Sequence, residues 1–135
     1  MLTQSLALAA LFTLAACAGR DRDARQERAA MQAAPLIPAM SRHLDSVAAT
    51  PAMLHQGLPD HAQRVHELMA AMHADMMRMG VHSDPAYEAL ADSAVSDLKS
   101  MDRASGAEYD RLAAAHIEHV RRLMAAYESK TGQPQ

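Results

Sequence analysis

The feature that most constrains the fold of this 135-residue chain is a helical pattern of apolar side chains, which runs from Leu36 almost to the C-terminus. Alanine, leucine and methionine dominate this part of the sequence. Aromatic residues make up 3% of the chain and β-branched residues are sparse, so the residue types that favour strands are scarce. The abundant residues are good helix formers. The sequence therefore predicts an all-α fold.

Proline and glycine divide this part of the chain into separate helices. The clearest start signal is Asp84-Pro85, because aspartate is a favoured N-cap and proline fits the first helical position. Gly80 is a good C-terminal signal for the preceding helix. Such signals predict helices over residues 36–49 and about 60–80, a third helix that opens at Asp84-Pro85 and a fourth that opens with the capping box of residues 105–108, with a short helical turn around residues 53–54. Four amphipathic helices joined by short loops predict an antiparallel up-and-down four-helix bundle.

Each helix has one apolar face, which we expect to form the core. In the second helix, Val65, Met69 and Met76 lie at the centre of that face. The expected core residues of the other three helices are Ile37, Met40, Leu44 and Val47, then Tyr87, Leu90, Ala94, Leu98 and Met101, and finally Tyr109, Leu112, Ala113, His116, Val120, Leu123, Met124 and Tyr127.

The N-terminal region has a different pattern. Residues 5–16 are almost wholly apolar, but this run is shorter than the roughly 20 residues that a transmembrane helix needs. It leads to Cys17, the only cysteine, in the sequence Leu14-Ala15-Ala16-Cys17, which resembles a bacterial lipobox. The resemblance implies that residues 1–16 are a lipoprotein signal peptide and that Cys17 is acylated after cleavage. Acylation would leave no thiol for a disulfide or a metal ion.

An acylated Cys17 makes a membrane the first expected partner. By resemblance to Gram-negative lipoproteins, we expect the periplasmic side of the cell envelope, and Ala18 in place of aspartate favours the outer membrane. Alternating basic and acidic residues over 17–34 predict a charged tether, followed by the bundle over 35–130 and a disordered tail over 131–135. The net charge of −3 argues against nucleic acid as a partner. The sequence identifies no protein partner.

The second helix is unusually rich in histidine and methionine. His66, Met69, His73 and Met76 recur at helical spacing, which we interpret as a ladder down one inward face. On the last helix, His116 lies on the apolar face and His119 at its edge. If the two helices touch, imidazole and thioether groups meet in one interior, a combination that suits copper above other transition metals. The predicted metal ligands are therefore His66, Met69, His73, Met76, His116 and His119.

Two other interpretations stay open. Methionine is a flexible core filler, so the same face is consistent with an envelope-stress or scaffold module that contacts a protein partner and binds no metal. Inward histidines would make such a module sensitive to pH between about 5 and 8. The other alternative is a non-covalent b-type haem bundle with Met40 and His116 as axial ligands. The scarcity of aromatic side chains to wall a porphyrin argues against it.

Known catalytic motifs are missing from the sequence. His66-Glu67 is followed by Ala70 at the position where the zinc-protease pattern H-E-x-x-H needs its second histidine. No glutamate begins the di-iron pattern E-x-x-H. There is no C-x-x-C-H haem motif and no glycine-rich phosphate loop. We therefore expect that the protein is not an enzyme.

Residues 105–111, Ser-Gly-Ala-Glu-Tyr-Asp-Arg, are followed by His116 and His119. This segment resembles the last helix of exported bacterial families that are rich in methionine and histidine, have ferritin-like four-helix folds and are known as domains of unknown function. The resemblance covers about the last 70 residues of the chain. The adjacent His-His pair of those families is replaced here by two histidines separated by Ile117-Glu118. The resemblance implies a bundle fold and export, and it assigns no activity.

Overall fold

The computed structural model describes residues 31–132, and every regular element in that range is a helix. The helices are α2 (Leu36–Ala49), α3 (Pro51–Gln56), α4 (Leu58–Arg78), α5 (Pro85–Met101) and α6 (Gly106–Thr131). The predicted all-α fold is thus confirmed. The predicted signal peptide, Cys17, most of the tether and the end of the tail lie outside the described residues.

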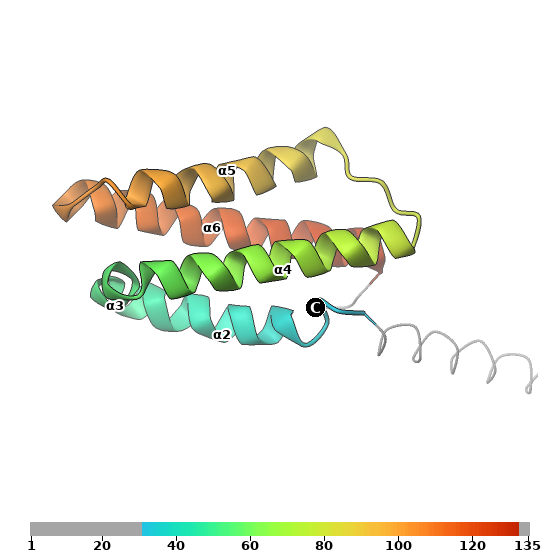
Figure 1. Cartoon of the computed structure of the whole chain (residues 1–135), viewed down its shortest axis with the longest axis horizontal. Helices are drawn as coiled ribbons and strands as arrows, with labels where there is room; N and C mark the ends of the chain where they lie inside the picture. Colours follow the sequence, from blue (N-terminus) through green and yellow to red (C-terminus); the bar gives the residue numbers. More distant parts are fainter. Residues whose placement is uncertain (1–30, 133–135) are drawn as a thin grey trace, which may run out of the picture. The chain divides into compact units, whose positions relative to one another are not determined.

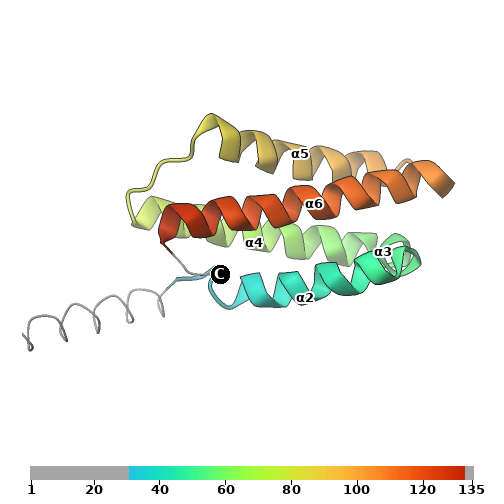
Figure 2. The same cartoon turned by 180° about the vertical axis from the view of Figure 1, so that it is seen from behind.

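Four of these helices are long and lie lengthwise beside one another (Figures 1 and 2). The short α3 lies at one end, where it leads the chain from α2 into α4. The pair α5 and α6 makes the most extensive contact, and α4 packs against both of them. Within residues 31–132, none of the helices combines the length and the apolar character that crossing a bilayer requires.

The start signals of α5 and α6 behave differently. The Asp84 side chain accepts a hydrogen bond from the Tyr87 backbone N–H at 2.9 Å, as expected for an N-cap. Ser105 is the residue before α6, but its side chain makes no capping hydrogen bond to the described residues. Gly106 has a φ of 57°, which only glycine adopts readily, and this turn changes the direction of the backbone at the start of α6.

The predicted apolar faces of three helices are confirmed as the core. All four residues expected on α2 are buried, as are all those expected on α5 and α6 except Leu90 and Leu112, which are half-buried. Among residues 31–132 the core contains no tryptophan or phenylalanine, and its largest fully buried side chain is Tyr127. Methionine and leucine supply much of the remaining volume.

The predicted inward face of α4 is only partly confirmed, because Val65 is buried as expected but the histidine ladder does not face the core. His66 and His73 are exposed and Met69 is half-buried, whereas Met76 is buried as expected. The residues that face the core are His61, Val65, Leu68, Ala71, Met72, Asp75 and Met76. At 3.6 residues per turn, this face is rotated by roughly 60° from the one that the hydrophobic pattern indicated. Methionines occur all round this helix and therefore do not mark one side, and the two polar residues that face inward, His61 and Asp75, give no apolar signal.

Candidate functional site

Three histidine rings from three helices are hydrogen-bonded in series through the interior. His43 of α2 contacts His61 of α4, with 2.8 Å between Nε2 and Nδ1. His61 in turn contacts His116 of α6, with 2.9 Å between the two Nε2 atoms. His61 is 1% exposed and His116 is 0% exposed. We call these three residues the histidine chain.

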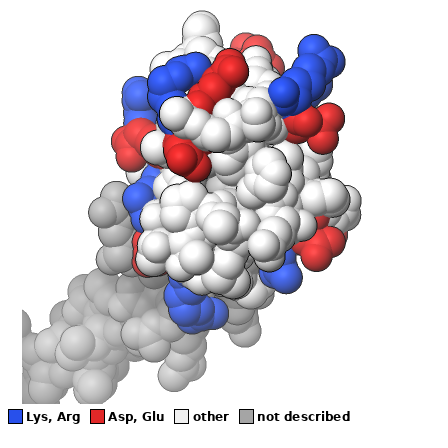
Figure 3. All heavy atoms as spheres, turned by 90° about the vertical axis from the view of Figure 1, so that its left-hand side faces the viewer, with Lys and Arg blue, Asp and Glu red and all other residues white. Residues whose placement is uncertain are grey.

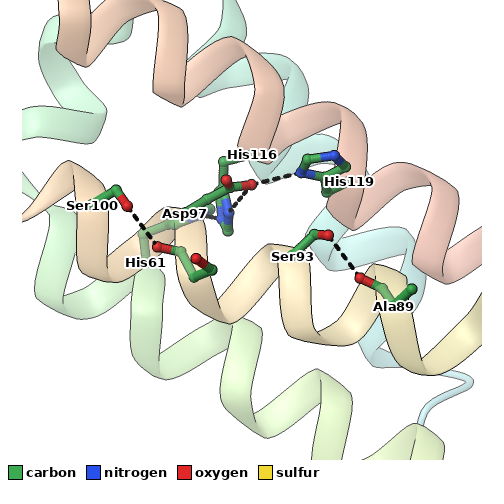
Figure 4. A network of polar contacts seen from close by, with 8 residues as sticks. His61, Ala89, Ser93, Asp97, Ser100, His116 and His119 are labelled. Carbon is green, nitrogen blue, oxygen red and sulfur yellow. Dashed lines mark hydrogen bonds and ion pairs between the residues drawn. The ribbon is translucent and has the colours of Figure 1, made fainter.

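A carboxylate of α5 lies at the inner end of the histidine chain. Asp97 accepts a hydrogen bond at Oδ2 from Nδ1 of His119, at 2.6 Å, and the same oxygen lies 3.8 Å from Nδ1 of His116 (Figure 4). Among residues 31–132, no side chain gives His116 Nδ1 a hydrogen bond of ordinary length, and the Ala94 backbone, like the Asp97 carboxylate, favours a proton on this ring. The four long helices thus each contribute at least one polar side chain to a single line of contacts.

The spacing of apolar residues explains how these side chains reach the interior. On α4, His61, Val65, Leu68, Met72 and Asp75 follow one another at alternating steps of four and three, which is the spacing of one helix face. On α6, His116 lies in the buried stripe that includes Ala113 and Val120. His61 and His116 therefore occupy core positions of their helices, and packing of α4 against α6 brings the rings together.

The interior holds these imidazoles in their neutral form. Burial, with smaller contributions from the neighbouring His116 and His43, lowers the pKa of His61 from 6.5 to about 3. Burial also lowers the pKa of His116 to about 4, against the opposing effect of the Asp97 carboxylate. The pKa of His43 is lowered as well, by burial and by the nearby Arg64 guanidinium. Near neutral pH, each ring therefore carries one N–H and one lone pair.

One direction of hydrogen bonding suits the whole chain. A proton on His116 Nδ1 faces the Asp97 carboxylate, whereas a lone pair there would face a negative charge. His116 Nε2 is then an acceptor, so His61 donates to it from Nε2. His61 Nδ1 in turn accepts from His43 Nε2. The dipoles of the three neutral rings are therefore aligned toward Asp97.

The outer end of the histidine chain opens to the surface. A small pocket with a cavity volume of about 70 Å³ lies between α2 and α4, and His43 is part of its wall. Met40, Arg64 and Glu67 line the same pocket. A small ion in this pocket would therefore meet the ring of His43 before the buried rings.

The predicted ligands are only partly brought together. His116 and His119 both lie at the site, on either side of Asp97. His66 and His73 point away from the core, so the expected meeting of these rings with His116 inside one cavity is wrong. Over residues 31–132, no three histidine, cysteine or acidic side chains converge closely enough to hold a metal ion. What the structure offers is a facing pair of imidazole nitrogens with further polar groups behind them.

Three residues of the site were missed in the sequence. His61 was overlooked because the apolar face of α4 was placed around Met69, although the steps of four and three from His61 through Val65 and Leu68 were present. His43 follows Met40 by three residues and Asp97 follows Ala94 by three, so both sit at the edge of a buried stripe. No sequence signal distinguished them from ordinary solvated residues.

A second polar cluster in the core has a structural explanation. The carboxylate of Asp75 accepts hydrogen bonds from the backbone N–H groups of Gln32 and Ala33 and from the hydroxyl of Tyr127, each at 2.9 Å. Burial alone would raise the pKa of Asp75, but these hydrogen bonds and the Arg78 guanidinium lower it. Every contact holds the carboxylate in its charged form, so this cluster fastens the chain before α2 to α4 and α6.

Comparison of the chain with models of protein families, with curated proteins and with solved structures gives no match in any of the three.

Proposed function

We propose that this protein is a lipid-anchored helical-bundle protein of the bacterial cell envelope, and that its bundle binds a transition-metal ion through the buried imidazoles of His61 and His116. The four long helices are proposed to form an antiparallel up-and-down bundle with α3 as a corner, which the short connections between successive helices support. The proposed anchor is the acyl-modified Cys17.

The observation that carries the metal proposal is the direct contact of two buried imidazole nitrogens. Burial of a polar ring costs free energy unless its nitrogens find partners, and a core position is more often filled by an apolar side chain. Here the Nε2 atoms of His61 and His116 face each other at 2.9 Å. Imidazole nitrogen is the commonest metal ligand in proteins and suits copper, zinc and nickel. A metal ion between the rings would use one lone pair of each Nε2 atom, once the proton on His61 Nε2 has moved to Nδ1 of the same ring.

Haem fits the same site poorly. The His61 and His116 rings are in direct contact, with 5.1 Å between their centroids, and leave no space for a porphyrin between them. In the alternative with Met40 and His116 as axial ligands, the Nε2 atom of His116 would first have to leave His61. We therefore favour a bare metal ion over haem.

Metal titration tests the proposal. The Cys17→Ser protein, purified in detergent and stripped of metal, is titrated with copper and zinc ions. We expect one ion per chain, with affinity lowered by about 10-fold or more in a His61→Gln/His116→Gln variant. The matched control is His66→Gln/His73→Gln, which removes two exposed imidazoles and is expected to leave that affinity unchanged. Equal binding by the wild-type protein and the His61/His116 variant would contradict the proposal.

The lipid anchor is tested separately. Cells supplied with a clickable fatty-acid analogue should label the wild-type protein and should not label a Cys17→Ala variant. The labelled protein should partition into the membrane fraction, and mass spectrometry of its N-terminal peptide should begin at the modified cysteine. Labelling that persists in the variant, or an unmodified N-terminus at Met1, would refute the anchor.

A second candidate function is contact with a protein partner. The end of the bundle that carries α3 has a broad surface area free of charged side chains (Figure 3), and Met53 on α3 is 55% exposed there. A photo-reactive amino acid at position 53 should give a specific crosslinked product in cells. The same group at position 118, an exposed site on α6, serves as the control. Identical crosslinking at both positions would remove this candidate.

A further inference from the structure

We infer that the facing Nε2 atoms of His61 and His116 form a two-coordinate site for a univalent soft ion, Cu(I), with His43 and Asp97 as the groups that orient the two ligands. This inference rests on the proposed metal function. It adds the identity of the ion, its coordination number and two residues that position the ligands.

The distance between the two ring nitrogens is shorter than a linear two-nitrogen site requires. Two metal–nitrogen bonds of about 2 Å each place their nitrogens about 4 Å apart. The two Nε2 atoms are now 2.9 Å apart, so the rings have to separate by roughly 1 Å to admit an ion. The rings belong to different helices, α4 and α6, and small rotations about their side-chain torsions provide such a movement without a change of fold.

Each ring has an outer partner on its other nitrogen. A metal-bound imidazole carries its proton on the remaining nitrogen and usually donates it to a carboxylate or another acceptor. His116 already faces Asp97 Oδ2 with its Nδ1, at 3.8 Å. His61 Nδ1 faces His43 Nε2 at 2.8 Å. When the ion binds, the proton on His61 moves from Nε2 to Nδ1, and that on His43 moves from Nε2 to its own Nδ1, so no proton is lost.

The number and charge of the available groups favour Cu(I). Divalent zinc and copper normally take four or more ligands, and among residues 31–132 no third histidine, cysteine, aspartate or glutamate side chain completes the pair. Univalent d¹⁰ ions accept two ligands in a line. One positive charge in the interior also costs less than two, because the penalty for a buried charge grows steeply with its magnitude. The Asp97 carboxylate beside His116 supplies one compensating negative charge.

The pocket at His43 provides a route for the ion. Met40 and His43 lie one turn apart on α2 and both line it, so the wall of the pocket includes the buried thioether of Met40 and the half-buried imidazole of His43. His43 is in direct contact with His61. We therefore place entry at this side of the bundle rather than at the His119 side.

The test compares ions and determines the coordination number. The Cys17→Ser protein is loaded anaerobically with one equivalent of Cu(I), and X-ray absorption is used to identify the ligands. We expect two nitrogen ligands, no sulfur, and displacement of Cu(I) by Ag(I) but not by an equal concentration of Zn(II). Three or more ligands, sulfur ligands, or preferred binding of Zn(II) would overturn the inference and leave the proposed metal function standing. Failure to bind any of these ions would overturn both.

Variants at the orienting residues give a second measurement. Asp97→Asn is expected to weaken Cu(I) binding by about 10-fold while two nitrogen ligands remain, because the carboxylate acts through His116. Asp97→Glu should recover most of that loss. His43→Asn is expected to slow Cu(I) uptake, and a matched change at an exposed ring, His66→Asn, should not. If the Asp97 and His43 variants bind and load as the wild-type protein does, these two residues have no such role.

Discussion

At the scale of single residues, two buried tyrosines make opposite contributions. Tyr127 and Tyr109 both lie in the stripe of α6 that faces the core. The Tyr127 hydroxyl donates to the charged Asp75 carboxylate at 2.9 Å. The Tyr109 hydroxyl is buried without a hydrogen-bond partner among residues 31–132, and its ring has an edge contact with His55. The two tyrosines can therefore be compared directly, because one of the two hydroxyl groups has a hydrogen-bond partner among the described residues and the other does not.

Removing each hydroxyl should change stability in opposite directions. Tyr127→Phe deletes a hydrogen bond to a charged group and leaves Asp75 short of a donor, so we expect a loss of about 2 kcal/mol in the free energy of unfolding. Tyr109→Phe deletes a buried hydroxyl that has no partner, and we expect a gain of up to about 1 kcal/mol. Urea denaturation followed by circular dichroism at 222 nm measures both. A loss of stability in Tyr109→Phe would mean that its hydroxyl has a partner in solution.

At the scale of helices, the caps of α5 and α6 offer another matched comparison. Asp84 accepts the Tyr87 N–H and is also paired with Lys130 near the end of α6. Ser105 occupies the same position before α6 without such a hydrogen bond. Asp84→Ala is expected to lower the melting temperature by about 3–6 °C, whereas Ser105→Ala should leave it nearly unchanged. Asp84→Asn keeps the capping oxygen and should fall between the two. Equal shifts in both alanine variants would contradict this difference.

Sequence reasoning succeeded for helices whose apolar and polar residues separate cleanly. The bounds of α2 and the start of α5 match the prediction, because the prolines of Thr50-Pro51 and Asp84-Pro85 restrict where a helix can stop or start. It failed on the face of α4, where Met69, Met77 and Met79 lie on the less buried side and the polar His61 and Asp75 lie inside. Burial of a polar residue depends on a partner from another helix, such as His116 or Tyr127, and one helix read alone does not contain that partner.

Only part of the candidate site could be predicted from the sequence, for the same reason. His116 was assigned correctly to the interior from its own helix, since α6 has an unbroken apolar stripe on both sides of it. The predicted partner of His116 on α4 is His66 or His73. The histidine of α4 that lies in the interior is instead His61, which precedes His66 by almost one and a half helical turns. Asp97 and His43 became visible only when the packing of α5 on α6 and of α2 on α4 was known.

At the scale of the whole molecule, the polar groups inside the bundle divide into two clusters with different responses to acid. The histidine chain depends on neutral rings, whereas Asp75 depends on a charged carboxylate. The pKa of Asp75 is below its usual value of 3.8, so its contribution is lost only when the pH falls below that value. The histidines respond at higher pH, which separates the two effects experimentally.

The histidine chain should make the metal-free protein less stable in mild acid. In the unfolded chain, His61 and His116 take up protons as the pH falls through 6.5, whereas in the folded protein they stay neutral down to about 3 and about 4. Between pH 6.5 and about 4 the unfolded state therefore binds more protons, and stability falls with pH by roughly 1 kcal/mol per unit for each ring. The urea midpoint, measured with a chelator present, should be constant above pH 7 and decrease steadily from about pH 6 to pH 4.5.

A His61→Gln/His116→Gln variant should lose most of this dependence of the midpoint on pH, whereas His66→Gln should keep it. A wild-type midpoint that stays level from pH 7 to pH 4.5 would show that these rings are not held neutral in the core.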